Sequence, residues 1–375
     1  MKKRIAALAL CISTICTIII GCTSDSKDDN NNTANYDKNA MLISWADNII
    51  IPSYTNYAAK VTTLNQSAAA FTATPNAQNL TTLRAAWLDA YKAYQHVGIF
   101  DIGKATDIHL LEATNTYPTD AAGIEANVAS GTYNLDVQAQ FAKQGFPALD
   151  YVMYGLGDTD AEVLAFYTTN ANAAKYKTYL TALIAKLKAT ADAIVADWNG
   201  SYRATFISSV NPVTGSVNQM TNNFVKNLEK DIRAPKVGIP AGLFSNGVLY
   251  PASVEAYYRN DVSKTLLNEA IDASKDFFNG TTFGTTTAGP GLKEFLDAVN
   301  AKSNGQNLST IINNQYTAIN TANGALSDSF SAQVAADNTK MTAAYNTMQQ
   351  QVVYTKVDMF SALSLTIDYV DGDGD

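Results

Sequence analysis

The sequence predicts an all-α protein built from two packed helical-bundle subdomains. Alanine-rich stretches place apolar residues three and four positions apart, which is the spacing of one face of a helix. The alternation of apolar and polar residues that marks half-buried strands is scarce. Residues 39–375 exceed the length of one typical core, so we expect two subdomains at roughly 39–207 and 218–375.

The first element is an export signal. Three basic residues at 2–4 and an apolar run at 5–20 precede Gly21 and Cys22, which is typical of a cleaved signal peptide over residues 1–21. The apolar run is shorter than the roughly 20 residues of a spanning helix. The residues around the junction resemble the lipobox of bacterial lipoproteins, so we expect lipidation of Cys22 and a cell-envelope location. An ordinary secretory signal is the alternative.

Residues 22–38 form the second element, a predicted disordered tether. The segment is polar and offers little to bury. Residues 27–29, Lys-Asp-Asp, resemble a signal that sends some lipoproteins to the cell surface, and a plain solvated linker is the alternative. The anchor therefore predicts an outer-membrane lipoprotein, in which the periplasmic and cell-surface faces both remain open.

Composition excludes several classes of function. Cys22 is the only one of the three cysteines outside residues 1–21, so the mature chain can form neither an internal disulfide nor a multi-thiolate metal site. Residues 1–21 carry three positive charges and no negative ones. Their removal takes the net charge from −8 to −11, and so acidic a chain is not expected to bind nucleic acid.

Four long helices are predicted beyond the tether, with loops between them. The helices are expected at residues 79–97, 176–198, 254–277 and 331–369. Gly-, Thr- and Asn-rich loops are expected at residues 114–134, 208–217 and 280–291, and the middle loop is the predicted boundary between the halves.

A short internal echo raises the possibility of a duplicated bundle. Residues 145–148 read Gly-Phe-Pro-Ala and residues 238–241 read Gly-Ile-Pro-Ala. If the echo reflects duplication, the two Gly-x-Pro turns meet at a pseudo-symmetric interface. Coincidence is the alternative.

Histidine limits the chemistry, because the chain has only His96 and His109. Three histidine ligands are therefore impossible. His109 and Glu112 have the i, i+3 spacing that can place two metal ligands on one helical face, and a surface pair near a helix end is the alternative. His96 lies near the end of its predicted helix, where C-terminal capping is the expected role.

Candidate site residues come from aromatic and acidic side chains on apolar faces. Trp87, Tyr91 and Tyr94 form one helical stripe, which suits a core or a binding surface. Buried tyrosine hydroxyls need partners, and the candidate partners are the acids Asp150, Glu255 and Asp358. A capped or solvent-facing acid is the alternative for each. Residues 368–375 have the alternate acids of a calcium loop, or form a solvated acidic tail.

Over residues 39–375 the sequence resembles the imelysin peptidase family. The agreement is carried by segments whose order and spacing match the family: 87–103, 115–120, 145–155, 238–242, 255–258, 356–359 and 371–375. The resemblance implies two helical-bundle subdomains with the family motif near their interface, a cell-envelope location, a link to iron uptake and a peptidase activity.

The departures from the family pattern bear on activity. In the Gly-x-His-x-x-Glu motif, Pro147 replaces the histidine and Asp150 the glutamate, while Tyr91 and Gly98 stand where arginine and glutamate are usual. A metal site at this motif has lost its nitrogen ligand, and a hydrolase needs a positioned base and an activated water.

Two functional hypotheses follow. The first is a non-catalytic lipoprotein that binds a metal-bearing ligand, or an envelope uptake protein, in the cleft between its halves. The second is a metallopeptidase that uses carboxylates alone, with Asp150 as a ligand of iron or another divalent metal. The predicted cleft residues are Trp87, Tyr91, Tyr94, Pro147, Asp150, Glu255 and Asp358.

Overall fold

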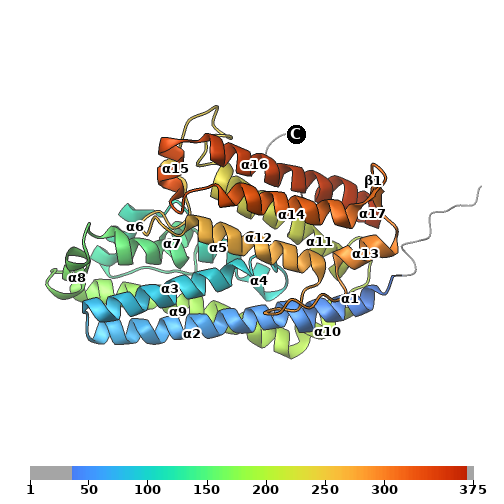
Figure 1. The fold of residues 1–375 in the computed structure, drawn as a ribbon. Helices are drawn as coiled ribbons and strands as arrows, with labels where there is room; N and C mark the ends of the chain where they lie inside the picture. The colour runs from blue at the N-terminus through green and yellow to red at the C-terminus, as the bar shows by residue number, and fades with distance from the viewer. Residues whose placement is uncertain (1–35, 370–375) are drawn as a thin grey trace, which may run out of the picture.

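The computed structural model describes residues 36–369, and the predicted all-α class is confirmed (Figure 1). Within that range the strands are a two-residue pair, β1 (Lys302–Ser303) and β2 (Gln306–Asn307). No helix in residues 36–369 has both the length and the apolar character needed to cross a membrane. The predicted signal peptide, Cys22, residues 22–35 of the predicted tether and the acidic residues from 370 onward lie outside the described residues.

The helices follow one another with short connections. Their bounds are α1 Lys38–Ser44, η2 Trp45–Ile50, α2 Ile51–Ala73, α3 Ala77–Gln95, α4 Lys104–Asp107, α5 Leu110–Asn115, α6 Ala121–Ser130, η3 Gln138–Lys143, α7 Gly145–Asp150, η4 Tyr151–Gly155, α8 Asp160–Thr168, α9 Ala173–Asp197, η5 Trp198–Tyr202, α10 Arg203–Ser208, α11 Ser216–Lys226, η6 Asn227–Gly238, η7 Pro251–Ser253, α12 Ser263–Asn279, α13 Leu292–Ala298, α14 Leu308–Gly324, α15 Phe330–Ala336, α16 Thr339–Val352, η8 Val353–Met359 and α17 Phe360–Leu363.

The first half of the chain packs around α2. Both α3 and α9 lie along α2, and their predicted counterparts at residues 79–97 and 176–198 agree with the structure to within a few residues. Asn76 caps α3 by accepting a hydrogen bond from the backbone N–H of Asn79 at 2.9 Å, as short polar side chains do at helix starts. The apolar stripe that predicted α3 faces the core.

The second half packs around α14. Helix α16 lies against α14 and η6, and α12 contacts α14 on one side and α3 on the other. Figure 1 shows α12 between the layer of α2, α3 and α9 and the layer of α14 and α16. The predicted loops at 208–217 and 280–291 agree with the structure. The first lies between the end of α10 at Ser208 and the start of α11 at Ser216, and the second lies between the end of α12 at Asn279 and the start of α13 at Leu292.

The predicted helix at residues 254–277 is wrong over its first turns. Helix α12 begins only at Ser263, and residues 254–260 form a turn in which Ala256 and Asn260 have φ of 56° and 64°. The apolar spacing of this segment resembles a helix, but tertiary contacts to the first half of the chain hold it in another conformation.

Two further expectations needed correction. The single helix predicted at 331–369 is broken after α15 by an extended Asp337, and residues 364–369 follow α17 outside any helix. The loop predicted at 114–134 contains α6, which Asp120 caps by accepting from Gly123 N–H at 2.9 Å. The two errors have the same cause. Asp337 ends a helix and Asp120 begins one, but the sequence pattern placed each of them inside a longer helix or loop.

The internal echo occupies two different local structures. Gly145 begins α7 with a φ of 75°, and Pro147 lies inside that helix. Gly238 instead ends η6, and Pro240 lies in the turn that follows. The two four-residue segments are therefore not equivalent in conformation.

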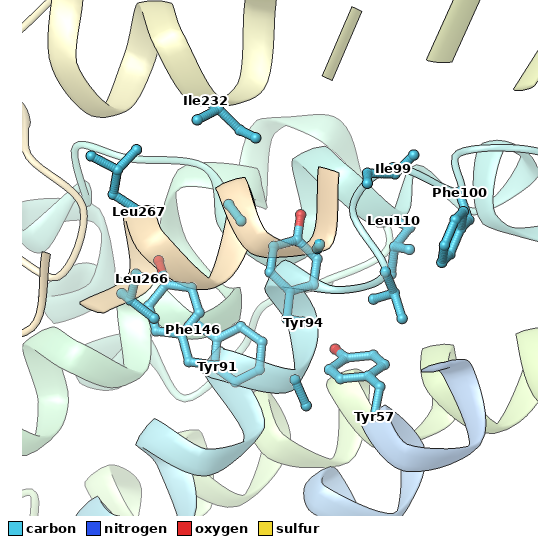
Figure 2. Packing of buried hydrophobic residues seen from close by; sticks show 14 of the residues in the cluster. Tyr57, Tyr91, Tyr94, Ile99, Phe100, Leu110, Phe146, Ile232, Leu266 and Leu267 are labelled. Atoms are coloured by element: carbon cyan, nitrogen blue, oxygen red, sulfur yellow. The ribbon is translucent and has the colours of Figure 1, made fainter. Parts of the chain in front are cut away.

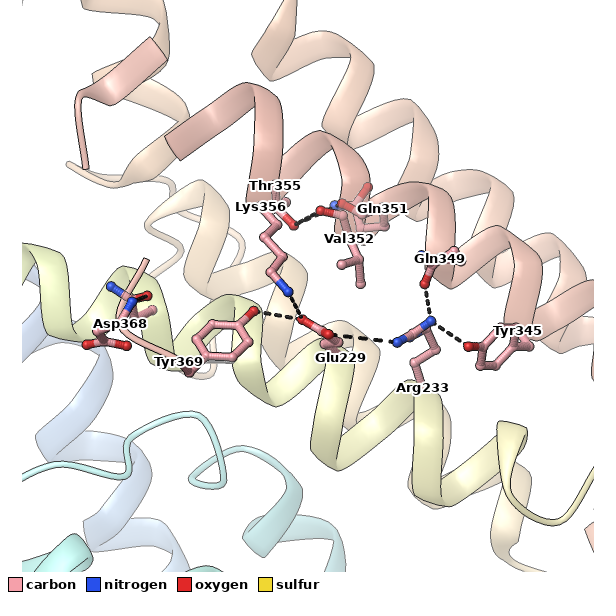
Figure 3. Close-up of polar contacts among 11 residues, drawn as sticks. Glu229, Arg233, Tyr345, Gln349, Gln351, Val352, Thr355, Lys356, Asp368 and Tyr369 are labelled. Carbon is pink, nitrogen blue, oxygen red and sulfur yellow. Dashed lines mark hydrogen bonds and ion pairs between the residues drawn. The ribbon is translucent and has the colours of Figure 1, made fainter. Parts of the chain in front are cut away.

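A buried ionic cluster fastens the end of the described chain to η6 (Figure 3). Glu229 accepts hydrogen bonds from Lys356 at 2.9 Å and from the Tyr369 hydroxyl at 2.8 Å, and Arg233 lies 4.0 Å from its other oxygen. Glu229 and Arg233 are almost completely buried. A buried charge that loses its counter-charge is costly, so this cluster should be sensitive to substitution.

Glu229→Gln should lower the free energy of unfolding by about 3 kcal/mol, because it leaves Lys356 and Arg233 without their shared carboxylate. Asp89→Asn is the matched control, since Asp89 pairs with Lys60 at the surface and should contribute less than about 1 kcal/mol. Urea unfolding measures both. Equal, small losses in the two variants would show that the cluster is not stabilising.

Candidate functional site

A cavity of about 340 Å³ lies between the two halves of the chain. The first half contributes α3 and the segment around α5, and the second half contributes η6 and part of α12. Its volume falls at the lower end of the range for small-molecule pockets. Its polar lining consists of Tyr94, Gln95, Glu112, Asn115, Thr116 and Tyr117 from the first half and Lys226, Asn227, Lys230, Asp231 and Lys236 from the second.

The aromatic stripe of α3 divides between core and cavity. The indole N–H of Trp87 donates to the Phe146 carbonyl at 3.2 Å, and the Tyr91 ring stacks on Phe146 with centroids 4.5 Å apart. Figure 2 shows Tyr91 beside Phe146, and Tyr94 with its hydroxyl directed toward the side where Ile232 of η6 lies. Trp87 and Tyr91 are therefore core residues, and among the three only Tyr94 lines the cavity.

Glu255 anchors the inner wall of the cavity. It is buried and accepts hydrogen bonds from Gln95 at 3.1 Å, from Asn115 at 2.8 Å and from the Lys236 ammonium. Asn115 in turn accepts the hydroxyl of Tyr91. Burial lowers the pKa of Lys236, and the Glu255 carboxylate beside it favours the charged form. The Tyr91 hydroxyl therefore donates to Asn115 and not directly to the predicted acid, and Asn115 connects it to Glu255.

Asp150 joins the halves at a second point. Its two oxygens accept the backbone N–H groups of Tyr258 at 2.8 Å and Arg259 at 2.9 Å, and its side chain is buried. These amides belong to the turn that sequence patterning predicted as helix. Burial raises the pKa of Asp150 to about 7, although the two hydrogen bonds oppose that shift.

The residues at the family-type motif offer a metal ion only one ligand side chain, Asp150. Pro147 has no ligand atom in its side chain, and both oxygens of Asp150 already accept backbone hydrogen bonds. Pro147 and Asp150 line a separate space of about 100 Å³, and Tyr117 lies between it and the larger cavity. Within residues 36–369, no group of three His, Cys, Asp or Glu side chains could hold a metal.

The remaining predicted residues lie elsewhere. Asp358 is half-buried on η8 and lines neither of these two cavities. His109 and Glu112 are both exposed, and His109 precedes α5 with a φ of 53°, so both lie on the surface at the start of a helix. His96 caps the end of α3, and its imidazole pairs with Glu269 of α12 at 2.9 Å.

Sequence reasoning missed the charged residues of η6. Asp231 accepts a hydrogen bond from Asn227 at 3.2 Å, and burial raises its pKa to about 7, while Lys226 lowers it. The sequence offered one signal for these residues, a proline at position 235 inside an otherwise helical segment. Pro235 lacks the N–H of a regular helix and η6 is a π-helix, a form that is frequent at functional sites.

The arrangement is suited to binding. The cavity wall holds amide, hydroxyl, ammonium and carboxylate groups on helices of both halves. Its lining contains no serine, cysteine or histidine that could act as a nucleophile or be paired with a base. These groups can orient a polar ligand.

Comparisons with known proteins agree with this fold. The sequence model of the family described as imelysin matches residues 50–357. Iron-regulated protein A of Synechococcus elongatus is 27% identical over 116 residues, which cover 31% of this chain and 32% of that protein, so the match spans about a third of the relative's length.

Two crystal structures share the architecture at low identity. A protein described as an iron-regulated protein A precursor from Parabacteroides distasonis has a TM-score of 0.71 and 16% identity, over 91% of this chain and 97% of that one. An imelysin-like protein from Psychrobacter arcticum has a TM-score of 0.62 and 14% identity, over 88% and 98% of the two chains.

The two buried carboxyls predict a pH dependence of stability. Because the pKa of Asp231 is about 7 in the folded protein and 3.8 unfolded, the native state binds more protons between these values. The free energy of unfolding should therefore rise as pH falls from 7 to 4, by up to about 1.4 kcal/mol per pH unit for this group. The variant Asp231→Asn is uncharged at every pH, so urea unfolding should give similar stabilities for the two proteins near pH 4 and a wild type that becomes progressively less stable than the variant as pH rises. Parallel curves would contradict the assignment.

Proposed function

Because the chain belongs to the imelysin family, we propose that it is a non-catalytic, lipid-anchored envelope protein that binds an iron-bearing ligand in the cavity between its halves. Iron enters the proposal through the name of the Synechococcus relative, iron-regulated protein A. An envelope uptake protein is the proposed recipient of the ligand.

The proposal rests on one contrast: the motif carboxylate is held by backbone amides, whereas the neighbouring cavity is open and lined by polar side chains. Asp150 is buried and its oxygens are occupied by the amides of Tyr258 and Arg259, so it serves to hold the halves together. The adjacent cavity is lined by polar groups from both halves. A protein that has a rigid polar cavity beside an immobilised motif is better suited to holding a ligand than to cleaving one.

One observation favours the alternative, a carboxylate-based metallopeptidase. A pKa of about 7 for Asp150 is the value that suits a general base near neutral pH. A base must also reach the proton that it removes, and the carboxylate faces backbone amides instead. Chelator-sensitive peptide hydrolysis that Asp150→Ala abolishes would establish this alternative and contradict the binding proposal.

The binding proposal can be tested by filling the cavity. A side chain at Gly98 would start 3.5 Å from Asn227 Nδ2 and 4.0 Å from Leu111 Cδ2, so it can enter the cavity without a backbone clash. Gly98→Leu should weaken the binding of iron ligands at least about tenfold, because the leucine occupies the space that the ligand needs. Calorimetric titration with ferric citrate, ferrous ion and haem measures the affinity.

Gly324→Leu is the matched control for this substitution. Gly324 is exposed on α14, and no atom lies within 4 Å of the position that its side chain would take. Affinity should be unchanged in this variant. If Gly98→Leu binds as tightly as the wild type, the ligand site is not this cavity.

The anchor is tested separately. Cys22→Ser removes the sulfur that would carry the lipid, so the protein should move from the membrane fraction to the soluble fraction and lose incorporation of labelled fatty acid. Fractionation with mass spectrometry of the N-terminal peptide measures both. Unmodified Cys22 in membrane-associated wild-type protein would contradict lipidation.

A further inference from the structure

Large apolar side chains are concentrated on the surface of one segment, residues 239–250, which connects η6 to η7 and is called the apolar loop below. In residues 36–369, 14 large apolar side chains are exposed, and six of them lie in these twelve positions. Single exposed apolar residues are ordinary, whereas a group of them marks a surface that contacts another apolar body. The six residues are Ile239, Leu243, Phe244, Val248, Leu249 and Tyr250.

Backbone hydrogen bonds hold the apolar loop in shape. The N–H of Tyr250 donates to the Pro240 carbonyl at 3.0 Å, which closes the loop at its base. Asn338, which precedes α16, donates to the Ala241 carbonyl at 2.8 Å. Figure 1 shows the loop, coloured yellow, beside α15 at the outside of the molecule. The loop is therefore fixed to the second half of the chain while its apolar side chains remain at the surface.

The apolar loop lies in a segment without charge. Residues 237–254 contain no Asp, Glu, Lys, Arg or His, and the flanking Lys236 and Glu255 are buried. A bilayer opposes every charge that enters it. A protein partner imposes no such rule, because the rims of protein interfaces carry polar and charged groups that orient the partner. Eighteen successive uncharged residues with exposed apolar side chains therefore favour a lipid surface as the occupant.

The position of the predicted anchor brings this surface within reach of a bilayer. Cys22 is followed by 13 residues before Tyr36, the first described residue. The 14 residues 22–35 span at most about 50 Å even when fully extended. A compact domain of the size of residues 36–369 has a radius of gyration of about 20 Å, so its diameter is similar to that span. A lipid on Cys22 thus keeps the domain close enough for any of its faces to meet the membrane.

We propose that the apolar loop is a second membrane contact, in which Leu243, Phe244, Val248 and Leu249 enter the acyl boundary of a bilayer and Tyr250 lies at the headgroup level. This inference rests on the lipid anchor of the proposed function, and it adds an orientation of the domain on the membrane. The loop directly follows η6, which forms one wall of the cavity. Contact through the loop therefore fixes where the cavity lies relative to the bilayer, which suits transfer of a ligand to a membrane protein.

A tryptophan in the apolar loop tests the proposal. The native Trp45, Trp87 and Trp198 are buried, so the added emission of Val248→Trp is the part that can respond to lipid. Full-length protein purified from the membrane fraction is reconstituted in phosphatidylcholine vesicles with and without brominated acyl chains. Val213→Trp is the matched control, because Val213 is 56% exposed and Val248 55%, and Val213 lies in the loop between α10 and α11.

The two reporters should differ, because bromine on acyl chains quenches only a nearby indole. The added emission of Val248→Trp should shift to shorter wavelength in vesicles and fall at least about twofold with brominated lipid, as expected for a side chain at the acyl boundary. That of Val213→Trp should do neither. Adding Leu243→Asp and Leu249→Asp to the Val248→Trp protein should abolish both effects, because the charges oppose insertion. Circular dichroism melting confirms that these surface substitutions leave the protein folded.

The outcomes separate the loop contact from the anchor. Lipidated protein in which Val248→Trp is quenched no more than Val213→Trp would overturn the loop contact and leave the anchor standing. Quenching of Val248→Trp in protein with an unmodified Cys22 would contradict the anchor and support the loop contact.

Two other occupants of the apolar loop would also overturn the proposal. A shift of Val248→Trp emission that rises with protein concentration and needs no lipid would assign the loop to a second copy of the chain. Photo-cross-linking from position 248 to one protein in intact cells, without quenching in vesicles, would assign it to a protein partner.

Discussion

The arrangement of the site depends on one buried carboxylate, Asp150, that accepts two successive backbone amides from the other half of the chain. Carboxylates rarely lie in a protein interior without such partners. The amides of Tyr258 and Arg259 are presented by a turn that includes positive φ at Ala256 and Asn260, a conformation that costs free energy for these residues. Removing the acceptor would release both the amides and the turn.

The same turn carries Glu255, whose hydrogen-bond partners line the cavity. Glu255 meets Gln95 and Asn115 of the first half and Lys236 of η6, so one side chain fixes three walls of the space. Gly98 keeps part of that space open, because any larger side chain there would project into it.

The spacing of apolar residues predicted the helices whose conformation depends on burying one face in the core. The stripe of α3 from Leu83 to Tyr94 gave the right helix because its spacing is enforced by one continuous core. The same method was wrong at residues 254–262, where the apolar spacing is helical but contacts to Asp150 decide the conformation. Asp150 and Glu255 could be identified as acids on apolar faces. Most of their partners could not, because Gln95, Asn115 and the amides of Tyr258 and Arg259 lie more than a hundred residues away in sequence from the acid that they contact.

The central claim is that iron is held between the halves and away from the motif carboxylate. A crystal structure of the protein with ferric citrate, with anomalous data collected at the iron edge, tests this claim most directly. The account predicts an anomalous peak inside the cavity lined by Tyr94, Lys226 and Asp231. A peak within bonding distance of Asp150, with the amides of Tyr258 and Arg259 displaced from it, would contradict the account.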